Sequence, residues 1–434
     1  MAARIWSYLR QHESHRDLLV CTRPNFRRSP QARPDAIIVP ASRSADNLDN
    51  AAALAGAVGC RLVVLCSLDA RGPDVAKLLR SKHVAEPLVV DIQPGYTHPL
   101  LEFETSDLVR QSLPRGTANP NGDLSVKRNL GLLLARMAGW QRIFFMDDDI
   151  RDLTTPDLLS VAAMLDKFRV AGMQVDDFPD NSVVCHARRE TGDRQDVFIS
   201  GSVLAVDSAK QVGFFPEVYN EDWLFFYDDV RARRAGCLQR SAAQLRYDPF
   251  ANPRRARRQE FGDVLAEGLY ALIHKTAGHE EATRKYWANF IAIRRKLIED
   301  IRKRPALLES KDRGNILSSL EGAVASLMKI QPQVCESYVK AWRRDLVEWR
   351  RRLSSVPATG SITDALHALG LERIEVAGAP PAALLPSPDV PLSREAQRAA
   401  LVSTVLTSGV LSSLVLSTRV LRRKGSVPAR ETSP

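Results

Sequence analysis

The chain has 434 residues, of which 44% are hydrophobic and 26% charged, so it can bury a substantial core and hold more than one domain. Its formal net charge of +10 suits anionic partners such as nucleotide diphosphates, acidic lipid headgroups or nucleic acid, without choosing among them or excluding a generally basic soluble protein. The six cysteines are scattered without a CxxC pair, a pattern that fits free thiols in a reducing compartment rather than a disulfide framework.

The chain begins with a polar segment that is rich in arginine and punctuated by prolines. We expect residues 1–34 to be an extension without a core of its own, apart from a short apolar patch at residues 18–21. Residues 1–17 contain no continuous apolar stretch, so no cleavable signal peptide is evident. We therefore expect the catalytic part to be cytoplasmic.

Two apolar runs with a helical pattern between them come next. Ala36–Pro40 is a run of strand length that ends at a proline, and Leu62–Cys66 is a second such run. The helix between them stops around Gly59. Strand, helix, strand predicts a right-handed parallel unit, and the lack of a GxGxxG loop argues against a dehydrogenase. Val89–Ile92 predicts a third strand.

The apolar run Arg142–Met146 breaks abruptly into three carboxylates, Asp147, Asp148 and Asp149. Adjacent carboxylates at the mouth of a hydrophobic element repel one another unless a cation binds there. A sheet built from βαβ units places its ligands at the carboxyl ends of strands, which is where these acids would fall. The pattern therefore predicts a metal site; a solvated turn or the cap of the next helix would use the same residue type.

Two further motifs follow. Val197–Val206 predicts an apolar strand, and Gly201 inside it indicates a close approach by a ligand or another backbone, or a bulge. Glu221 and Asp222 are adjacent acids, followed by Trp223 and three hydrophobic residues. Ordinary helix-cap chemistry would account for one of these acids, and core packing would account for the tryptophan.

Met146–Asp149 resembles the DxD motif of the GT-A nucleotide-sugar glycosyltransferases, and the helix that carries residues 127–129 is also typical of that group. The pair Glu221–Asp222 resembles the acidic pair of inverting GT-A enzymes, and the nearest relatives would be family 2-like. Both motifs in this order are more specific than either alone. The resemblance implies a GT-A glycosyltransferase domain over residues 35–270, an α/β fold with a mixed, mainly parallel sheet.

The resemblance also implies a metal-dependent transfer of a sugar from a nucleoside-diphosphate sugar to an acceptor hydroxyl. Asp147 and Asp149 would hold Mn²⁺ or Mg²⁺ on the diphosphate. Asp222 would remove the proton from the acceptor hydroxyl, Glu221 would position the acceptor, and Trp223 would stack on its sugar. Inversion of the anomeric centre is the expected outcome, with retention left open.

In such enzymes the turn after the first strand wraps the nucleotide base, the second strand ends near the base and ribose, and a helix cation faces the diphosphate. The residues expected to bind the nucleotide-sugar are Pro40, Ala41, Arg43, Ser67, Arg128, Asn129, Asp147, Asp148, Gly201 and Ser202. The acidic pair familiar at the second strand is absent, and Asp69 follows two residues on. A further metal ligand is expected downstream, where His274, His279 and Asp248 are candidates.

An arginine cluster follows the second acidic motif and would bind the leaving diphosphate or an anionic acceptor, because guanidinium forks match phosphate oxygens. A solvated loop is the competing interpretation. The cluster consists of Arg254, Arg255, Arg257 and Arg258.

The remainder of the chain is predicted in three parts. Residues 271–353 have a helical pattern and form a helical appendage, and residues 354–394 are a linker around one short helix. Residues 395–434 combine an uncharged stretch, Ala399–Thr418, with a basic flank. That stretch has the length of a membrane span, while a peripheral or packed helix fits its serines and threonines equally well.

The expected partners are a nucleoside-diphosphate sugar and a saccharide, lipid or small-molecule acceptor, with no nucleic acid. Peripheral contact with the inner face of the membrane would come from the C-terminus. A nucleotidyltransferase of the same fold is the main rival, but Pro40–Arg43 lacks the glycines of its first loop. A non-catalytic scaffold or nucleic-acid-binding protein is the other alternative, and no recognisable reading motif supports it.

Overall fold

The computed structural model describes residue 12 and residues 14–23, 33–113, 123–175, 182–193 and 198–376. These residues belong to one compact unit, Met1–Ala383. The predicted C-terminal segment 395–434 and the linker beyond residue 376 lie outside the described residues.

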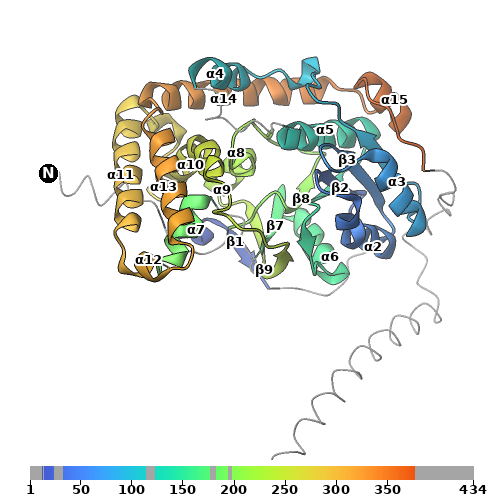
Figure 1. Cartoon of the computed structure of the whole chain (residues 1–434). Coiled ribbons are helices and arrows are strands. Elements are labelled where there is room, and N and C mark those ends of the chain that lie inside the picture. Colours follow the sequence, from blue (N-terminus) through green and yellow to red (C-terminus); the bar gives the residue numbers. More distant parts are fainter. Residues whose placement is uncertain are drawn as a thin grey trace, which may run out of the picture. The chain divides into compact units, whose positions relative to one another are not determined.

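Nine strands in the described part of the chain form one mixed, mostly parallel sheet (Figure 1). The strands are β1 (Val20–Thr22), β2 (Ala36–Ala41), β3 (Arg61–Cys66), β4 (Leu88–Asp91), β5 (Arg142–Met146), β6 (Ile150–Arg151), β7 (Val170–Val175), β8 (Val203–Asp207) and β9 (Ala235–Gln244). Their order is β1-β9-β7-β8-β5-β2-β3-β4, and β6 pairs with β9. Along this order β8 is antiparallel to its neighbours β5 and β7, and the other pairs are parallel. The α/β class and the mixed, mainly parallel sheet are confirmed.

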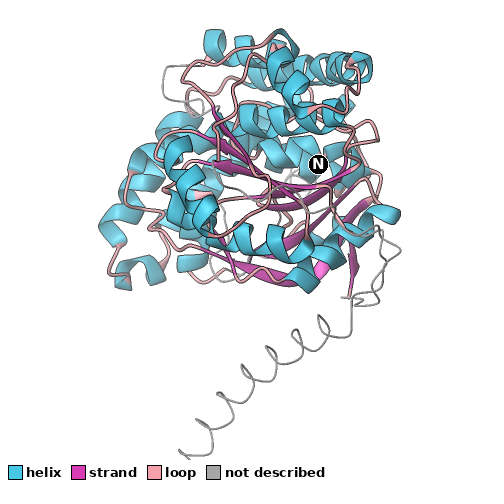
Figure 2. Ribbon diagram, turned by 90° about the vertical axis from the view of Figure 1, so that its right-hand side faces the viewer, coloured by secondary structure: helices cyan, strands magenta, loops and turns pink. Residues whose placement is uncertain are grey.

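Helices cover both faces of this sheet, and Figure 2 shows the strands between helical layers. The α-helices are α2 (Asp49–Val58), α3 (Gly72–Ser81), α4 (Glu104–Ser112), α5 (Asp123–Ala138), α6 (Thr155–Ala163), α7 (Val183–Glu190), α8 (Glu221–Phe225), α9 (Tyr227–Arg231), α10 (Pro253–Ile273), α11 (Arg284–Arg302), α12 (Pro305–Glu309), α13 (Arg313–Leu327), α14 (Pro332–Ser355) and α15 (Ile362–Ala368). Short 3-10 helices are η1 (Arg16–Leu18), η3 (Ala45–Leu48), η4 (Pro99–Leu101), η5 (Met164–Asp166) and η6 (His279–Glu281).

The central strands are buried on both faces. All six residues of β2 are buried. Ile37 and Val39 belong to the apolar cluster that includes α2, α3 and α6, whereas Ala36 and Ile38 belong to the larger cluster that includes α5 and the C-terminal helices. Because successive side chains of a strand point to opposite faces, a doubly covered strand needs a continuous apolar run. This is why the apolar runs in the sequence locate the strands correctly.

One predicted strand is shorter than expected. Val197–Val206 was expected to be a single strand. Val197 lies outside the described residues, and within residues 198–206 β8 begins only at Val203, with Gly201 and Ser202 in a turn before it. The N–H of Gly201 donates to the carboxylate of Asp222 at 2.7 Å, so it is not available to continue the sheet. The sequence reasoning also did not identify α3, α7, β7 and β9.

The ends of the described chain pack on the same unit. In the predicted N-terminal extension, β1 forms one edge of the sheet and pairs in parallel with β9, and Leu18 is buried in the larger apolar cluster. The predicted boundary at residue 270 lies inside α10. In the predicted linker, Ile374 forms an isolated bridge with Val89 at the opposite edge of the sheet. No helix among the described residues is both long and apolar enough to cross a membrane.

Candidate active site

Lys127 is fully buried near the start of α5, at the ends of two neighbouring strands. Its Nζ atom donates to the main-chain oxygen of Ala41 at 2.9 Å and to the hydroxyls of Ser42 and Ser67 at 2.7 and 2.8 Å. Burial lowers the pKa of Lys127, and the Asp123 carboxylate 3.2 Å away opposes this change. Lys127 therefore ties together the carboxyl ends of β2 and β3.

The next residue, Arg128, joins the two acidic motifs. Its Nη2 atom donates to both carboxylate oxygens of Asp147, at 2.8 and 3.0 Å, and its Nη1 atom donates to Glu221. Only 3% of the Arg128 side chain is exposed, so these bonds form away from bulk water, where opposite charges attract more strongly. Burial would lower the pKa of Arg128, but the two carboxylates raise it overall. Two motifs far apart in the sequence therefore lie in one site.

The turn before β8 contacts both motifs. Gly201 lies against the guanidinium of Arg128, and its N–H donates to Oδ2 of Asp222 at 2.7 Å. The main-chain oxygen of Ser202 accepts from the N–H of Asp147 at 3.0 Å. Gly201 and Ser202 were expected beside a donor sugar, and the structure brings both residues to the acids.

Asp148 is buried and faces the loop after β2. Its Oδ2 atom accepts from the backbone N–H groups of Ser42 and Arg43 at 2.7 and 2.8 Å, and its Oδ1 atom accepts from the Arg43 guanidinium. The same guanidinium lies 2.7 Å from the carboxylate of Asp149. The Arg43 side chain is 45% exposed, so it offers a cation at the surface while it neutralises two buried acids.

Asp149 and Gln244 form a second polar pair at this edge. Nε2 of Gln244, the last residue of β9, donates to Oδ2 of Asp149 at 2.9 Å. Within the described part of the chain, Oδ1 of Asp149 and Oε1 of Gln244 are buried without a hydrogen-bond partner. Burial, followed by the charge of Asp147, raises the pKa of Asp149 to about 6.

These oxygen atoms suit a hard divalent cation, because Mg²⁺ and Mn²⁺ prefer carboxylate and carbonyl oxygens. The two oxygens without partners, on Asp149 and Gln244, and the 19%-exposed side chain of Asp147 have the chemistry that such an ion prefers. A bound cation would share Asp147 with Arg128 and Asp149 with Arg43. Among the described residues no three His, Cys, Asp or Glu side chains are already grouped as metal ligands.

Asp222 is 8% exposed and lies at the start of α8. Its Oδ1 atom accepts from the N–H of Trp223 at 2.9 Å, opposite the bond to Gly201. Burial raises the pKa of Asp222, and the nearby Arg128 opposes this change. Burial also raises the pKa of Glu221, again against the effect of Arg128. A carboxylate with a raised pKa is a stronger base than an exposed one, so Asp222 suits proton abstraction.

Trp223 packs into an aromatic cluster. Its ring centroid lies 4.8 Å from that of Tyr270, 5.1 Å from that of Phe198 and 5.0 Å from that of His15. The hydroxyl of Tyr270 donates to the main-chain oxygen of Trp223 at 3.0 Å. The half-buried Trp223 thus supports α8 from the side of the core, and its stacking on an acceptor sugar stays a prediction.

Two residues that were expected to contact the nucleotide-sugar donor have contacts within the protein core. Asn129 is buried, and its side chain forms two 2.8 Å hydrogen bonds with the backbone of Phe215, one as donor and one as acceptor. Pro40 lies inside the buried strand β2, paired with Leu65 of β3. Ser67, in contrast, lies at the strand ends, where its hydroxyl accepts a hydrogen bond from Lys127, and its contact with a donor stays a prediction.

The three downstream candidates for a metal ligand have other contacts. His274 lies 3.0 Å from His15, and His279 lies 3.4 Å from Arg231. Asp248 accepts from the backbone N–H of Phe250 at 2.8 Å. The downstream residue that reaches the acids is instead Gln244, which the sequence reasoning missed. In the sequence, the short apolar run at the start of β9 was the one feature that could have indicated this strand and the residue at its end.

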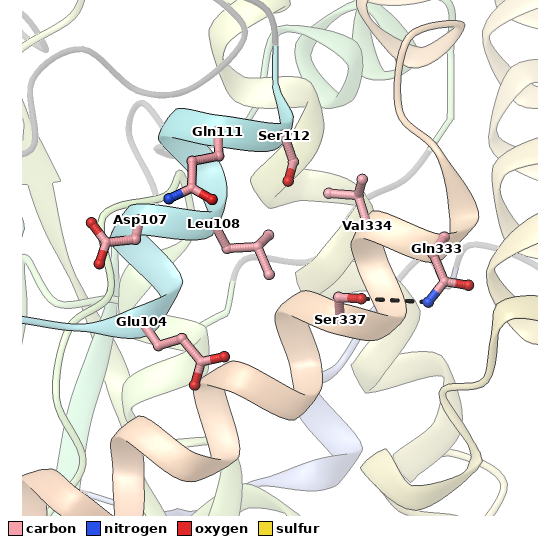
Figure 3. Close-up of a pocket in the computed structure, with 8 residues that line it drawn as sticks. All are labelled: Glu104, Asp107, Leu108, Gln111, Ser112, Gln333, Val334 and Ser337. Carbon is pink, nitrogen blue, oxygen red and sulfur yellow. Dashed lines mark hydrogen bonds between the residues drawn. The ribbon is translucent and has the colours of Figure 1, made fainter.

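A separate pocket of about 500 Å³ opens between α4 and α14 (Figure 3). Polar side chains surround it, among them Glu104, Asp107 and Gln111 of α4 and Ser337 of α14. None of the expected site residues lines this pocket. It therefore does not bear on the chemistry of the acidic cluster.

No protein-family model matches this chain, and no curated protein matches it. The residues of the site and their geometry are therefore the basis for a functional proposal.

Proposed function

We propose that the chain is a glycosyltransferase that moves a sugar from a nucleoside-diphosphate sugar to an acceptor hydroxyl. The observation that carries this proposal is the double contact of Arg128 with Asp147 and Glu221. It unites the acids after β5, suited to a donor diphosphate and its cation, with the acids of α8, suited to an acceptor. The mixed, mainly parallel sheet supports the same GT-A assignment.

Asp222 is the general base in this proposal. Both of its oxygens accept a backbone hydrogen bond, from Gly201 and Trp223, which fixes the carboxylate while leaving lone pairs for a hydroxyl proton. Its raised pKa favours proton uptake as the acceptor oxygen attacks. Glu221, held by Arg128, orients the acceptor. Attack opposite the leaving group inverts the anomeric centre.

The donor lies at the ends of β2, β3 and β5. Arg43 presents its half-exposed guanidinium to the diphosphate, and Lys127 holds the hydroxyl of Ser67 beside the nucleoside. Mn²⁺ or Mg²⁺ held by Asp147, Asp149 and Gln244 would neutralise charge on the leaving diphosphate. Arg128 keeps Asp147 in place for that role.

A panel of UDP-, GDP- and ADP-sugars with Mn²⁺ tests the proposal by thermal shift and by release of the nucleoside diphosphate. A donor at one hundred times its Kd adds about 2.7 kcal/mol to the stability. We expect Asp149→Asn to lose this shift, and Asp222→Asn to keep it but lose sugar transfer. Glu299→Gln is the control, because Glu299 lies on α11 in a surface ion pair with Arg295.

The proposal fails if no sugar nucleotide shifts the melting temperature of the wild type, or if Asp222→Asn transfers sugar at the wild-type rate. Release of a sugar 1-phosphate in place of a nucleoside diphosphate would identify the rival nucleotidyltransferase, because attack on the α-phosphate breaks the bond between the two phosphates and leaves the second phosphate on the sugar. Both products are measured in the same reaction.

A further inference from the structure

A cluster of basic and aromatic side chains lies where α7, α10 and the loop before α10 meet. We call His186, Arg189, Tyr247 and Arg255 the α7 cationic cluster. Nη2 of Arg189 donates to Nδ1 of His186 at 2.9 Å, and the guanidinium of Arg255 lies 4.4 Å from the ring centroid of Tyr247. The rings of His186 and Tyr247 meet edge to face, 6.0 Å apart. The four side chains are thus one contiguous group.

The two arginines of this cluster lack a direct carboxylate partner among the described residues, although the charge of Glu190 acts on Arg189. Arg255 donates to the main-chain oxygen of Asp248 at 3.3 Å, and across the described chain neither Arg255 nor Arg189 forms an ion pair with a carboxylate. Nη1 of Arg189 is buried without a hydrogen-bond partner among those residues. Burial lowers the pKa of Arg189, which reflects the cost of holding a desolvated cation. An anion bound here would remove that cost.

The cluster is attached to both acidic motifs. Asp263 of α10 accepts a hydrogen bond from Asn220, the residue before Glu221, at 3.0 Å. The same Asp263 also bonds to the side chain of Ser182, which caps the start of α7. On the other side, the N–H of Leu245, two residues before Tyr247, donates to the main-chain oxygen of Asp149 at 2.8 Å. The elements that carry the cluster are therefore fixed to the candidate site.

We propose that the α7 cationic cluster binds a phosphate group of the acceptor. This inference rests on the proposed function and adds a substrate class to it. The two guanidinium groups of Arg189 and Arg255 match phosphate oxygens in charge and geometry. In the proposed function the donor diphosphate has its own cation, the half-exposed Arg43, next to the acids that follow β5. A free phosphate ester and a lipid phosphate offer the same chemistry to the cluster.

The test is calorimetric titration of the full chain with inorganic phosphate. We expect saturable binding in the wild type and at least a tenfold weaker affinity in the double variant Arg189→Gln/Arg255→Gln. The control is Arg295→Gln, which removes an exposed arginine from α11. Because neither cluster arginine has an ion pair to lose among the residues that the structure describes, the double variant should keep the wild-type melting temperature. Equal phosphate binding by the wild type and a folded double variant would overturn the proposal.

Competition between nucleotides and inorganic phosphate shows whether the cluster binds the donor or the acceptor. UDP and GDP with Mn²⁺ should leave phosphate binding unchanged, and displacement of phosphate by either nucleotide would overturn the acceptor assignment. Vesicles that contain phosphatidic acid distinguish a lipid phosphate from a free phosphate ester. Vesicle binding that the double variant loses assigns the cluster to a lipid phosphate, and phosphate binding without vesicle binding assigns it to a free phosphate ester.

The outcome is separable from that of the proposed function. Sugar-nucleotide binding without phosphate binding would overturn the α7 cluster proposal alone. Phosphate binding in a chain that binds no sugar nucleotide would overturn the transferase and, with it, the acceptor role of the cluster.

Discussion

A Cβ atom added to Gly201 would lie 2.6 Å from Cζ of Arg128. Gly201 has no positive φ, so the close approach of the guanidinium, rather than backbone freedom, requires a glycine here. The sequence indicated a close approach at this position. The partner is a side chain of this protein, the arginine that joins Asp147 to Glu221.

Gly201→Ala should therefore push the Arg128 guanidinium away from its two carboxylates. We expect a lower melting temperature and loss of sugar transfer, because both acids would lose a buried counter-ion. Gly56→Ala is the matched control: Gly56 lies inside α2 with no atom within 4 Å of an added Cβ. That change should stabilise the protein by roughly 0.5–1 kcal/mol, since alanine is the better helix residue. An unchanged melting temperature and activity in Gly201→Ala would contradict the arrangement.

Asn129→Ala distinguishes a structural residue from a donor ligand. It removes both hydrogen bonds to the backbone of Phe215 and leaves those groups buried and unsatisfied. We expect a loss of about 1–3 kcal/mol in unfolding free energy, with unchanged affinity for the sugar nucleotide. Asn315→Ala, at an exposed position of α13, is the control. Full stability with weakened donor binding would instead support the role predicted from the sequence.

The buried Arg294 provides a sharp test of the helical layer. It donates to Glu260 at 2.6 and 3.0 Å and also bonds to Asp263, and it is fully buried. Arg294→Met would leave two buried carboxylates without their cation, which should cost about 3–5 kcal/mol in urea unfolding. The neighbouring Arg295 is half exposed, so Arg295→Met should cost less than about 1 kcal/mol. Similar losses in both variants would show that the network contributes little.

His186 should make stability depend on pH. Burial, with the charges of Arg189 and Arg255, lowers its pKa from 6.5 to about 3. The unfolded chain therefore binds a proton more readily than the folded chain does between these values. The stabilisation from a neutral His186 is complete above about pH 6.5 and is lost as the pH falls toward about 3.

His186→Phe removes this titration. The stability of the wild type relative to the variant should decline below about pH 6.5 by at most about 1.4 kcal/mol per pH unit. Urea unfolding of both proteins across that range measures the difference. Parallel pH profiles of the two proteins would mean that His186 titrates normally. Arg189→Gln should raise the pKa of His186, and a proton NMR titration of the ring measures that change.

The sequence located much of the fold because apolar runs of strand length are local signals. Ile37, Val63 and Phe144 lie in runs that became central strands, and the three acids follow β5 directly. It did not locate β9, in which only the first four residues are consecutively buried. Gln244, at the end of that strand, was missed for the same reason, since its neighbours give no periodic pattern.

The sequence by itself determined which residues carry charge at the strand ends and in what order the elements follow one another. Tertiary structure alone decided the partners: Arg128 with Glu221, Arg43 with Asp148, and Gln244 with Asp149. The reason is physical. Burial of the apolar faces sets the sheet order and inserts β7 and β8 between β5 and β9. Desolvated charges must then find counter-ions among residues distant in sequence, which no local pattern specifies.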